Sequence, residues 1–439
     1  MNSIFITGLA TAYPPHTVKQ DDFEGLLNRL YPDRITEPGT KIKARPIIFD
    51  PSTWTKEDAA PPSIQELSSI YQDVGVALSA QACSKAMLEA QVSASEITHI
   101  VAVTCTTQSN PGYDLFVCQK LSLDPSVQRV LLHGVGCAGG LSALRAAANL
   151  AAAASSRGQP ARILVIACEL CSLFLRAELQ ACLQDQELHI APALFSDAAA
   201  AVVVTNGLAL DRASGQRPVY ELHQWGSMLV PGTADQMSYN MEEHGKLSSP
   251  YALHICFSGG SQTNIDTPLG MIANITKHVP KTAVSAILPM LAHLHKSNSP
   301  PTSHLTPSEF DWALHPGGAS ILQGATDNLG LSQDHIRASL AVYENYGNSS
   351  SPTVLIVLNG LRKLGPGRDH VVAASFGPGI AIEMFLMQRC REIGVKNGIE
   401  EMLRGSVGGK REKMVSVLRG WVGKVGEKGT GKKWAALIE

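Results

Sequence analysis

Three side chains that can do chemistry lie at glycine- or serine-rich corners of this sequence: Cys137, His315 and Asn348. Cys137 follows a short apolar run, has glycines on both sides and precedes a stretch rich in Ala and Leu. Glycines permit a sharp turn and the close approach of a ligand to the backbone. A thiol at a helix N-terminus lies beside exposed N–H groups and the positive end of the helix dipole, which favour the thiolate. We therefore predict that Cys137 is a nucleophile rather than a cysteine packed as a small hydrophobe.

His315 and Asn348 occupy two further corners. The strand-like run 310–314 leads into His315-Pro-Gly-Gly, and a helix is predicted over 319–329. Because a strand, a reactive residue, paired glycines and a helix also follow one another around Cys137, the pattern predicts a duplicated α/β unit whose two turns face one another. Asn348 lies in a third corner, before a helix predicted over 352–362.

Together the three corners would support acyl-transfer chemistry. A thiolate can accept an acyl group from a thioester, and an imidazolium beside it would hold the thiolate charged. A histidine and a carboxamide can also donate hydrogen bonds to a thioester oxygen, which stabilises the enolate left when a malonyl thioester loses carbon dioxide. This chemistry needs neither a metal nor a redox cofactor, and we expect neither.

The elements that position these corners alternate between strands and helices. Strands are predicted over 3–8, 98–104, 129–133, 163–167, 198–205, 371–374 and 380–386, and helices over 21–30, 63–91, 114–121 and 173–185. Ser63 and Glu66 form a capping box at the start of one of these helices. The strands are continuous Val/Ile/Ala runs, which predicts a sheet covered by helices on both faces. The helix after Cys137 is apolar nearly all round and should be central.

Length and composition narrow the class of protein. A chain of 439 residues suffices for roughly two or three domains. The net charge of −2 gives no sign of nucleic-acid binding, and no stretch of about 20 uncharged apolar residues could cross a membrane. The first residues lack the basic region and long apolar core of a secretion signal, so we expect a cytoplasmic protein.

The cysteines show no pattern of a disulfide framework or of a zinc site. They number nine, and most lie in apolar segments. Cys168 and Cys171 form a lone CxxC motif without a second ligand pair, which favours packing over zinc binding.

We divide the chain into an N-terminal half, 1–231, which carries the cysteine, and a C-terminal half, 232–390, which carries His315 and Asn348. Residues 232–267 are rich in Ser, Gly, Asn and Met and are predicted to be an inserted loop region, with a possible short strand at 252–257. Residues 391–439 form a basic extension. A second basic group comprises Arg29, Arg34, Lys41, Lys43 and Arg45. This group is either solvated or a binding site for the phosphates of a ligand.

Five segments resemble the signature blocks of the type III polyketide synthases, the chalcone synthase superfamily. They are GCAGG at 136–140, ALFSDAAAAVVV at 193–204, WALHPGG at 312–318, YGNSSSPTVL at 346–355 and SFGPG at 375–379, in the family's order and spacing. The resemblance implies the thiolase fold, a duplicated five-layered αβαβα sandwich, in a homodimer that takes malonyl-CoA and acyl-CoA as substrates.

The same resemblance assigns roles to individual residues. It implies that Cys137 carries the acyl chain and that His315 and Asn348 form the pair for decarboxylation and oxyanion binding. Phe195 matches a gate between the CoA tunnel and the cavity, and Ser350 matches a cavity-lining serine. The loop that shapes the site corresponds to Gly377, Pro378 and Gly379.

Several departures from the plant enzymes resemble the fungal branch of the family. Ala273, in MIANITKHVP at 271–280, falls where plant enzymes carry a second gate phenylalanine. Loss of that ring would widen the entrance. The block after the cysteine is one residue shorter, the 232–267 region is longer and the tail is extra. Fungal members commonly take fatty acyl-CoA starters and form alkylpyrones, alkylresorcinols or alkylresorcylic acids, and the resemblance implies such a product here.

Two alternatives belong to other classes. One is a ketoacyl-acyl-carrier-protein synthase that initiates fatty-acid synthesis; it shares Cys, His and Asn, but its histidine block typically reads HQAN and it makes a single condensation. The other is a non-catalytic protein of the thiolase fold. The sequence HPGG and the Gly-Pro-Gly loop argue against the first alternative, and the complete set of three corners argues against the second.

Overall fold

The computed structural model describes residues 3–23, 25, 40–50, 61–185, 189–211, 216–243, 269–296, 302–364 and 367–390. The predicted strand at 252–257, the basic extension 391–439, Arg29, Arg34 and most of the predicted helix at 21–30 lie outside these residues. Among the described helices, none is both long and apolar enough to span a bilayer.

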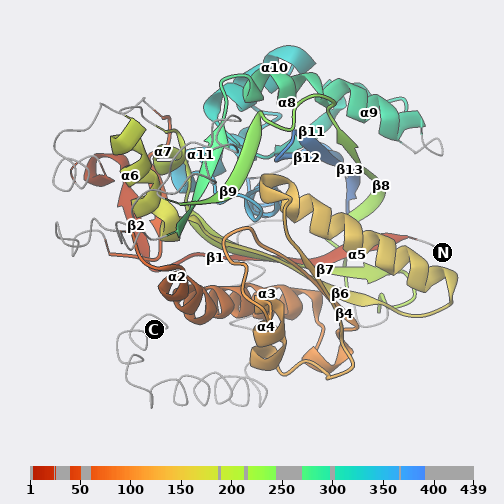
Figure 1. Cartoon of the computed structure of the whole chain (residues 1–439). Coiled ribbons are helices and arrows are strands. Elements are labelled where there is room, and N and C mark those ends of the chain that lie inside the picture. Colours follow the sequence, from red (N-terminus) through yellow and green to blue (C-terminus); the bar gives the residue numbers. More distant parts are fainter. Residues whose placement is uncertain are drawn as a thin grey trace. The chain divides into compact units, whose positions relative to one another are not determined.

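A mixed sheet of nine strands organises the described residues (Figure 1). In spatial order its strands are β11 (Phe310–Leu314), β12 (His370–Gly377), β13 (Ala381–Arg389), β8 (Tyr220–Leu229), β1 (Ile4–Ala12), β7 (Asp197–Asn206), β6 (Arg162–Leu170), β4 (His99–Val103) and β5 (Gln128–Leu132). Strands β1 and β8 pair over only three residues, from Ile4 to Ile6, whereas β8 pairs with β13 along its whole length. The sheet therefore consists of two strand layers, β1 with β4–β7 and β8 with β11–β13.

Two apolar helices lie between the strand layers. Helix α5 (Gly139–Ser156) contacts β6 and β7 on one side and β12 and β13 on the other, and α12 (Thr353–Leu361) contacts both layers as well. Leu141, Leu144 and Val357 are fully buried in this inner core. The prediction that the helix after Cys137 is central is confirmed.

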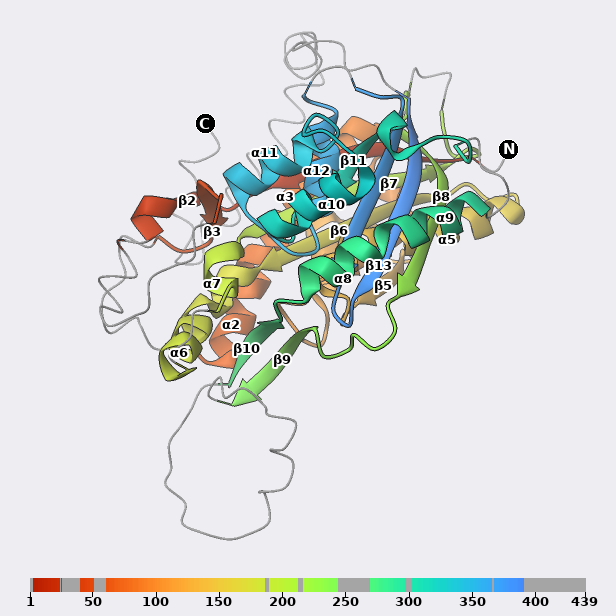
Figure 2. The same ribbon diagram turned by 90° about the horizontal axis from the view of Figure 1, so that it is seen from above.

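The outer faces of both strand layers are covered by further helices (Figures 1 and 2). Helices α3 (Val76–Ala90) and α4 (Tyr113–Leu121) cover the first layer. Helices α9 (Ile287–Lys296) and α10 (Ala319–Leu329) cover the second layer, and α8 (Val279–Ser285) packs against these two helices. Along β6, Ile163 and Val165 point into the inner core, whereas Leu164 and Ile166 point into the outer one. Burial of both faces explains why the strands read as continuous apolar runs. The fold is the predicted α/β thiolase sandwich.

Several shorter elements complete the described part of the chain. They are β2 (His16–Lys19), β3 (Ala44–Ile47), α2 (Ile64–Ile70), α6 (Leu175–Asp185), α7 (Ala191–Leu194) and α11 (Arg337–Tyr346). Helix α2 begins at the predicted capping box, in which Ser63 and Glu66 each bond the other's backbone amide. A π-helical turn, Tyr71–Gly75, joins α2 to α3 into one long helical region. This region ends at its C-cap residue, Gln91, as predicted.

Two predictions about segments of the C-terminal half need correction. The 232–267 region is not wholly a loop, because β9 (Met237–Glu243) pairs with β10 (Leu269–Ile275) in a two-stranded ribbon (Figure 2). The signal was the alternation of Met237, Tyr239 and Met241 with polar residues, which is the period of a strand. The predicted turn at 375–379 is shorter, because β12 continues to Gly377.

Candidate active site

The Cys137 turn is pressed against the Gly-Pro-Gly loop. After β5 the chain forms a 3₁₀ turn, Gly136–Ala138, that runs directly into α5. Gly136 has a φ of +46°, and a Cβ on it would lie 2.6 Å from Cδ of Pro378. A Cβ on Gly377 would lie 2.5 Å from the carbonyl oxygen of Val135. Only glycine fits at both points, so the loop fixes where the thiol stands.

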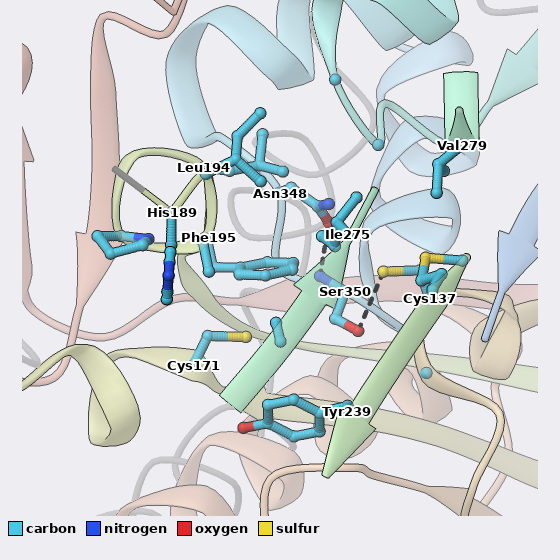
Figure 3. Close-up of a pocket in the computed structure, with 18 of the residues that line it drawn as sticks. Cys137, Cys171, His189, Leu194, Phe195, Tyr239, Ile275, Val279, Asn348 and Ser350 are labelled. Atoms are coloured by element: carbon cyan, nitrogen blue, oxygen red, sulfur yellow. Dashed lines mark hydrogen bonds between the residues drawn. The ribbon is translucent and has the colours of Figure 1, made fainter. Parts of the chain in front are cut away.

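The Asn348 corner faces the same thiol. The thiol of Cys137 donates to Oγ of Ser350 at 3.4 Å (Figure 3). The backbone N–H of Ser350 donates to Oδ1 of Asn348 at 2.8 Å, and Ser350 itself has a left-handed φ of +57°. This turn fixes both side chains beside Cys137.

Phe195 is tied to the same corner through its neighbours. The N–H of Asn348 donates to the carbonyl of Leu194 at 3.1 Å, and the N–H of Ser196 donates to the carbonyl of Asn348 at 2.9 Å. In Figure 3 the ring of Phe195 lies between His189 on one side and Ser350 on the other. Phe195 therefore separates the part of the site beside His189 from the part beside Ser350 and Cys137.

His315 follows the end of β11, where its N–H donates to the carbonyl of Ala374 at 2.8 Å. The side chain is 1% exposed, and neither ring nitrogen has a hydrogen-bond partner among the described residues. A buried polar group without a partner requires an explanation, and a bound ligand is one. The imidazole also lines the cavity described below.

A buried carboxyl group braces the corner from behind. Glu169, at the end of β6, accepts from the N–H of Cys105 at 3.0 Å, from Oγ1 of Thr106 at 2.8 Å and from Oγ of Ser351. The pKa of Glu169 is raised, because burial has a larger effect than these hydrogen bonds, which lower it. Because Ser351 adjoins Ser350, Glu169 links the Asn348 corner to the end of β4.

Burial opposes a charge on either member of the cysteine–histidine pair. It raises the pKa of the Cys137 thiol to about 11, although the side chains of Ser350 and Asn348 lower it. It lowers the pKa of His315 to about 3. Burial thus acts against the preference for the thiolate that a helix N-terminus provides.

A single cavity of about 750 Å³ brings the predicted side chains together. Those that line it are Cys137, Phe195, Ala273, His315, Asn348, Ser350 and Pro378. Gly377 and Gly379 instead support the wall; the N–H of Gly379 donates to the carbonyl of Met237 at 3.0 Å. Most of the remaining lining is apolar, including Phe23, Phe174, Leu175, Leu194, Tyr239, Ile275, Val279, Ile321 and Phe376.

Sequence reasoning missed several residues of this cavity: Cys105, Cys171, Glu178 and His189. The CxxC motif was the one available signal. Its Cys168 packs in the core as predicted, but Cys171 lines the cavity. No group of His, Cys, Asp or Glu side chains within the described ranges is placed to hold a metal ion.

The described members of the basic group at 29–45 differ in their surroundings. Lys43 pairs with Glu344 near the surface. Arg45 is 3% exposed, lines the cavity and lies over the ring of Phe23 at 4.1 Å. For Arg45 the solvated interpretation is wrong, because its guanidinium is packed among other groups.

The site can be compared with known proteins. The chalcone and stilbene synthase N-terminal domain matches residues 50–207, and the C-terminal domain of the same family matches residues 257–391. The chain belongs to the chalcone and stilbene synthase family.

Relatives place this family member among fungal type III polyketide synthases. The chain is 40% identical over 407 residues to the type III polyketide synthase pspB of Penicillium soppii, covering 88% of this chain and 96% of that one. It is 34% identical to the acylalkylpyrone synthase csyB of Aspergillus oryzae, with 88% and 94% covered. The crystal structure of the fungal type III polyketide synthase ORAS matches at 36% identity with a TM-score of 0.77, covering 88% of this chain and 99% of that one.

The chain is therefore a type III polyketide synthase, an enzyme of the acyltransferase type. This result favours the polyketide synthase over both alternatives, the ketoacyl-acyl-carrier-protein synthase and the non-catalytic protein. A structure of the relative CsyB in complex with CoA, at 32% identity and a TM-score of 0.78, covers 88% of this chain and 100% of that one.

Proposed function

We propose that this type III polyketide synthase condenses malonyl-CoA with a fatty acyl-CoA starter. The starter would be held as a thioester on Cys137 and extended by decarboxylative condensation. Ring closure would then yield an alkylpyrone, an alkylresorcinol or an alkylresorcylic acid. Since csyB is named as an acylalkylpyrone synthase, the pyrone is the product class that a relative supports.

The observation that carries this proposal is the mostly apolar lining of the cavity that holds Cys137. The cavity of about 750 Å³ has the size of ordinary small-molecule sites, and Phe195 and Ala273 on β10 line it together with Cys137. Each methylene buried in an apolar channel contributes roughly 0.8 kcal/mol, which favours an alkyl starter over a short one. Ala273 presents only a methyl group to this space.

Each residue has a defined task in the proposed reaction. The Cys137 sulfur attacks the acyl-CoA carbonyl and its proton passes to His315. His315 then gives this proton to the departing CoA sulfur, so CoA leaves as the thiol. Malonyl-CoA then binds with its thioester oxygen at His315 and Asn348. Loss of carbon dioxide leaves its electron pair as an enolate, which these donors stabilise. The enolate carbon attacks the acyl carbonyl, and the Cys137 sulfur leaves.

The remaining assignments belong to the same proposal. Phe195 and Ala273 flank the acyl channel, Ser350 holds the thiol, and Gly377, Pro378 and Gly379 shape the wall. The enzyme would act in the cytoplasm as a homodimer, with malonyl-CoA and acyl-CoA as its substrates and no cofactor.

Acyl-CoAs of graded chain length, each incubated with malonyl-CoA, test the proposal when products are identified by mass. Medium or long acyl-CoAs should give the highest kcat/KM. Cys137→Ala should remove the acyl adduct seen by intact-protein mass spectrometry, whereas Cys390→Ser, which changes an exposed thiol outside the cavity, should keep it. Preference for acetyl-CoA or an aromatic starter, or an adduct on Cys137→Ala, would contradict the proposal.

A further inference from the structure

A buried carboxyl group joins helix α6 to the ribbon that carries Ala273. Oε1 of Glu178 accepts a hydrogen bond from the backbone N–H of Ala273 at 2.8 Å. The Glu178 side chain is almost fully buried, and both residues line the cavity. The two residues are far apart in sequence, so this bond connects the two halves of the chain at the cavity wall.

The ribbon needs such a connection. Strand β10 pairs on one side with β9, and these two form a separate sheet within the described part of the chain. An isolated two-stranded ribbon is at best marginally stable, and a buried edge amide must find an acceptor. The amide of Ala273 finds one in Glu178. Helix α6 contacts β10 accordingly.

His189 completes the connection from the other side. Its Nδ1 lies 3.7 Å from Oε2 of Glu178, and its side chain is 14% exposed. An imidazolium beside a carboxylate carries no net charge as a pair, and neither does a neutral imidazole beside a protonated carboxyl group. Such a pair is far less costly in an apolar wall than a single buried charge. The backbone N–H of His189 also donates to Sγ of Cys182 on α6. In Figure 3 His189 lies on the far side of Phe195 from Cys137.

We propose that Glu178, supported by His189, is a specificity-determining positioning residue. By holding the amide of Ala273 it fixes the distance between β10 and α6, and with it the width of the acyl channel on the far side of Phe195 from Cys137. This inference rests on the proposed fatty acyl-CoA function and deepens it. The chain-length preference is then set by the position of the backbone at Ala273 as well as by the small size of its side chain.

Paired substitutions test the inference. Glu178→Leu removes the acceptor at similar size, and Glu178→Gln keeps a carbonyl oxygen that can still accept from Ala273. Glu89→Leu is the matched control, because Glu89 also holds a backbone amide, that of Leu9 at 2.9 Å, and pairs with Arg362 outside the cavity. The full chain is used in each case, and thermal unfolding is recorded for each variant.

The first readout is the ratio of kcat/KM between the preferred acyl-CoA and one that is four carbons shorter. A ratio cancels differences in the amount of active enzyme. We expect Glu178→Leu to lower it at least about fivefold, since a loosened wall no longer distinguishes chain lengths. Glu178→Gln should keep it within about twofold of wild type, and so should Glu89→Leu, whose site lies elsewhere.

Hydrogen exchange of the β10 amides gives a second readout that does not depend on activity. Faster exchange at Ala273 in Glu178→Leu, but not in Glu89→Leu, is expected. An unchanged ratio, unchanged exchange or an equal effect in Glu89→Leu would overturn the inference. Lack of any chain-length preference in the wild type would instead count against the proposed function, while the exchange result would still judge the hydrogen bond.

Discussion

Burial disfavours the charged forms of both Cys137 and His315. The pKa of the thiol is raised to about 11 and that of the imidazole is lowered to about 3, so neither group ionises alone near neutral pH. In the proposed mechanism His315 takes the proton of the thiol, and the two opposite charges then stabilise each other. The thiolate and the imidazolium would thus form together.

Removal of the imidazole should therefore slow alkylation of Cys137. In His315→Ala the thiol is expected to keep its raised pKa, so little thiolate is expected at pH 7. We expect the rate of iodoacetamide labelling at pH 7 to fall at least about tenfold relative to wild type. As pH rises toward 11 the variant should recover, because its thiolate fraction increases. Mass spectrometry of the Cys137 peptide measures the labelling. Equal rates in the variant and in wild type at pH 7 would contradict the proton transfer.

Asn348 should matter more for decarboxylation than for acyl loading. Loss of one oxyanion donor typically lowers the rate about a hundred- to a thousandfold. Asn348→Ala is therefore expected to accept a starter on Cys137 yet to release carbon dioxide from malonyl-CoA more slowly by that factor. Asn345→Ala, on the exposed side of α11, is the control. Wild-type release of labelled carbon dioxide by Asn348→Ala would refute the role.

Ala273 should control the length of the accepted starter. A phenyl ring at this position would fill part of the channel beside Phe195. Each methylene that no longer fits would forfeit roughly 0.8 kcal/mol. Ala273→Phe should shift the kcat/KM optimum toward shorter acyl-CoAs, while a short starter still loads Cys137. An unchanged chain-length profile would show that other residues define the channel.

At the scale of elements, the contact between β12 and the Cys137 turn determines the geometry of the site. Gly136 and Gly377 allow the two segments to approach until a side chain on either would overlap the other. Helix α5 follows the turn directly and α12 packs against α5, so a shift of the turn would also disturb the inner core.

A methyl group at Gly377 should therefore disturb the nucleophile. In Gly377→Ala the new Cβ would lie 2.8 Å from Cβ of Ala138 and would have to push the turn away. Overpacking of this kind costs about 1–3 kcal/mol. We expect a lower Tm and slower labelling of Cys137.

A glycine within α12 provides the comparison. In Gly360→Ala the new Cβ would lie 3.8 Å from Val342, an ordinary contact, and a helix interior favours Ala over Gly. That variant should be as stable as wild type or more so by about 0.5–1 kcal/mol. If Gly377→Ala were equally harmless in thermal unfolding and labelling, the close contact would not determine the geometry.

At the scale of the molecule, a buried carboxylate holds the second strand layer together. The carboxylate of Asp311 on β11 accepts hydrogen bonds from the two terminal guanidinium nitrogens of Arg337 on α11, at 2.7 and 2.9 Å. It also binds Arg368, which precedes β12, at 3.0 Å, and Arg389, at the end of β13, at 2.5 Å. Three separate elements thus converge on one fully buried side chain.

Neutralising Asp311 should destabilise the protein in a pH-dependent way. Burial raises the pKa of Asp311, but the bonds from Arg337 and Arg389 outweigh it, and the net shift is downward. A lowered folded-state pKa gives stability that is present above the unfolded value of about 3.9 and is lost as pH falls through the folded value. Asp311→Asn should cost about 3–5 kcal/mol at pH 7, and the difference should shrink in acid.

Denaturant titrations at pH 7 and at low pH measure this difference. Asp327→Asn, on the exposed side of α10, should change little. A deficit for Asp311→Asn that stayed constant with pH would mean that the loss arises from packing rather than from the charge.

The sequence by itself determined the corners and the strands. The sharp turn at Cys137 needs a glycine at Gly136, and strands buried on both faces must be apolar at every position; both requirements are local and can be read from neighbouring residues. Strand β11 and helix α10 accordingly begin and end at the predicted residues. The ordered signature blocks added the family, which the comparisons confirm.

The tertiary structure decided what surrounds those corners. Cys105 and Glu178 carry no spacing that marks them, and the bond from Ala273 to Glu178 spans 95 residues of sequence. Ribbon β9–β10 was hidden because its short alternation lies among Ser, Gly and Met residues typical of loops. The pKa values of Cys137 and His315 also depend on burial, which only the packed fold provides. Local patterns predict turns and strands, whereas solvation and long-range neighbours are properties of the assembled core.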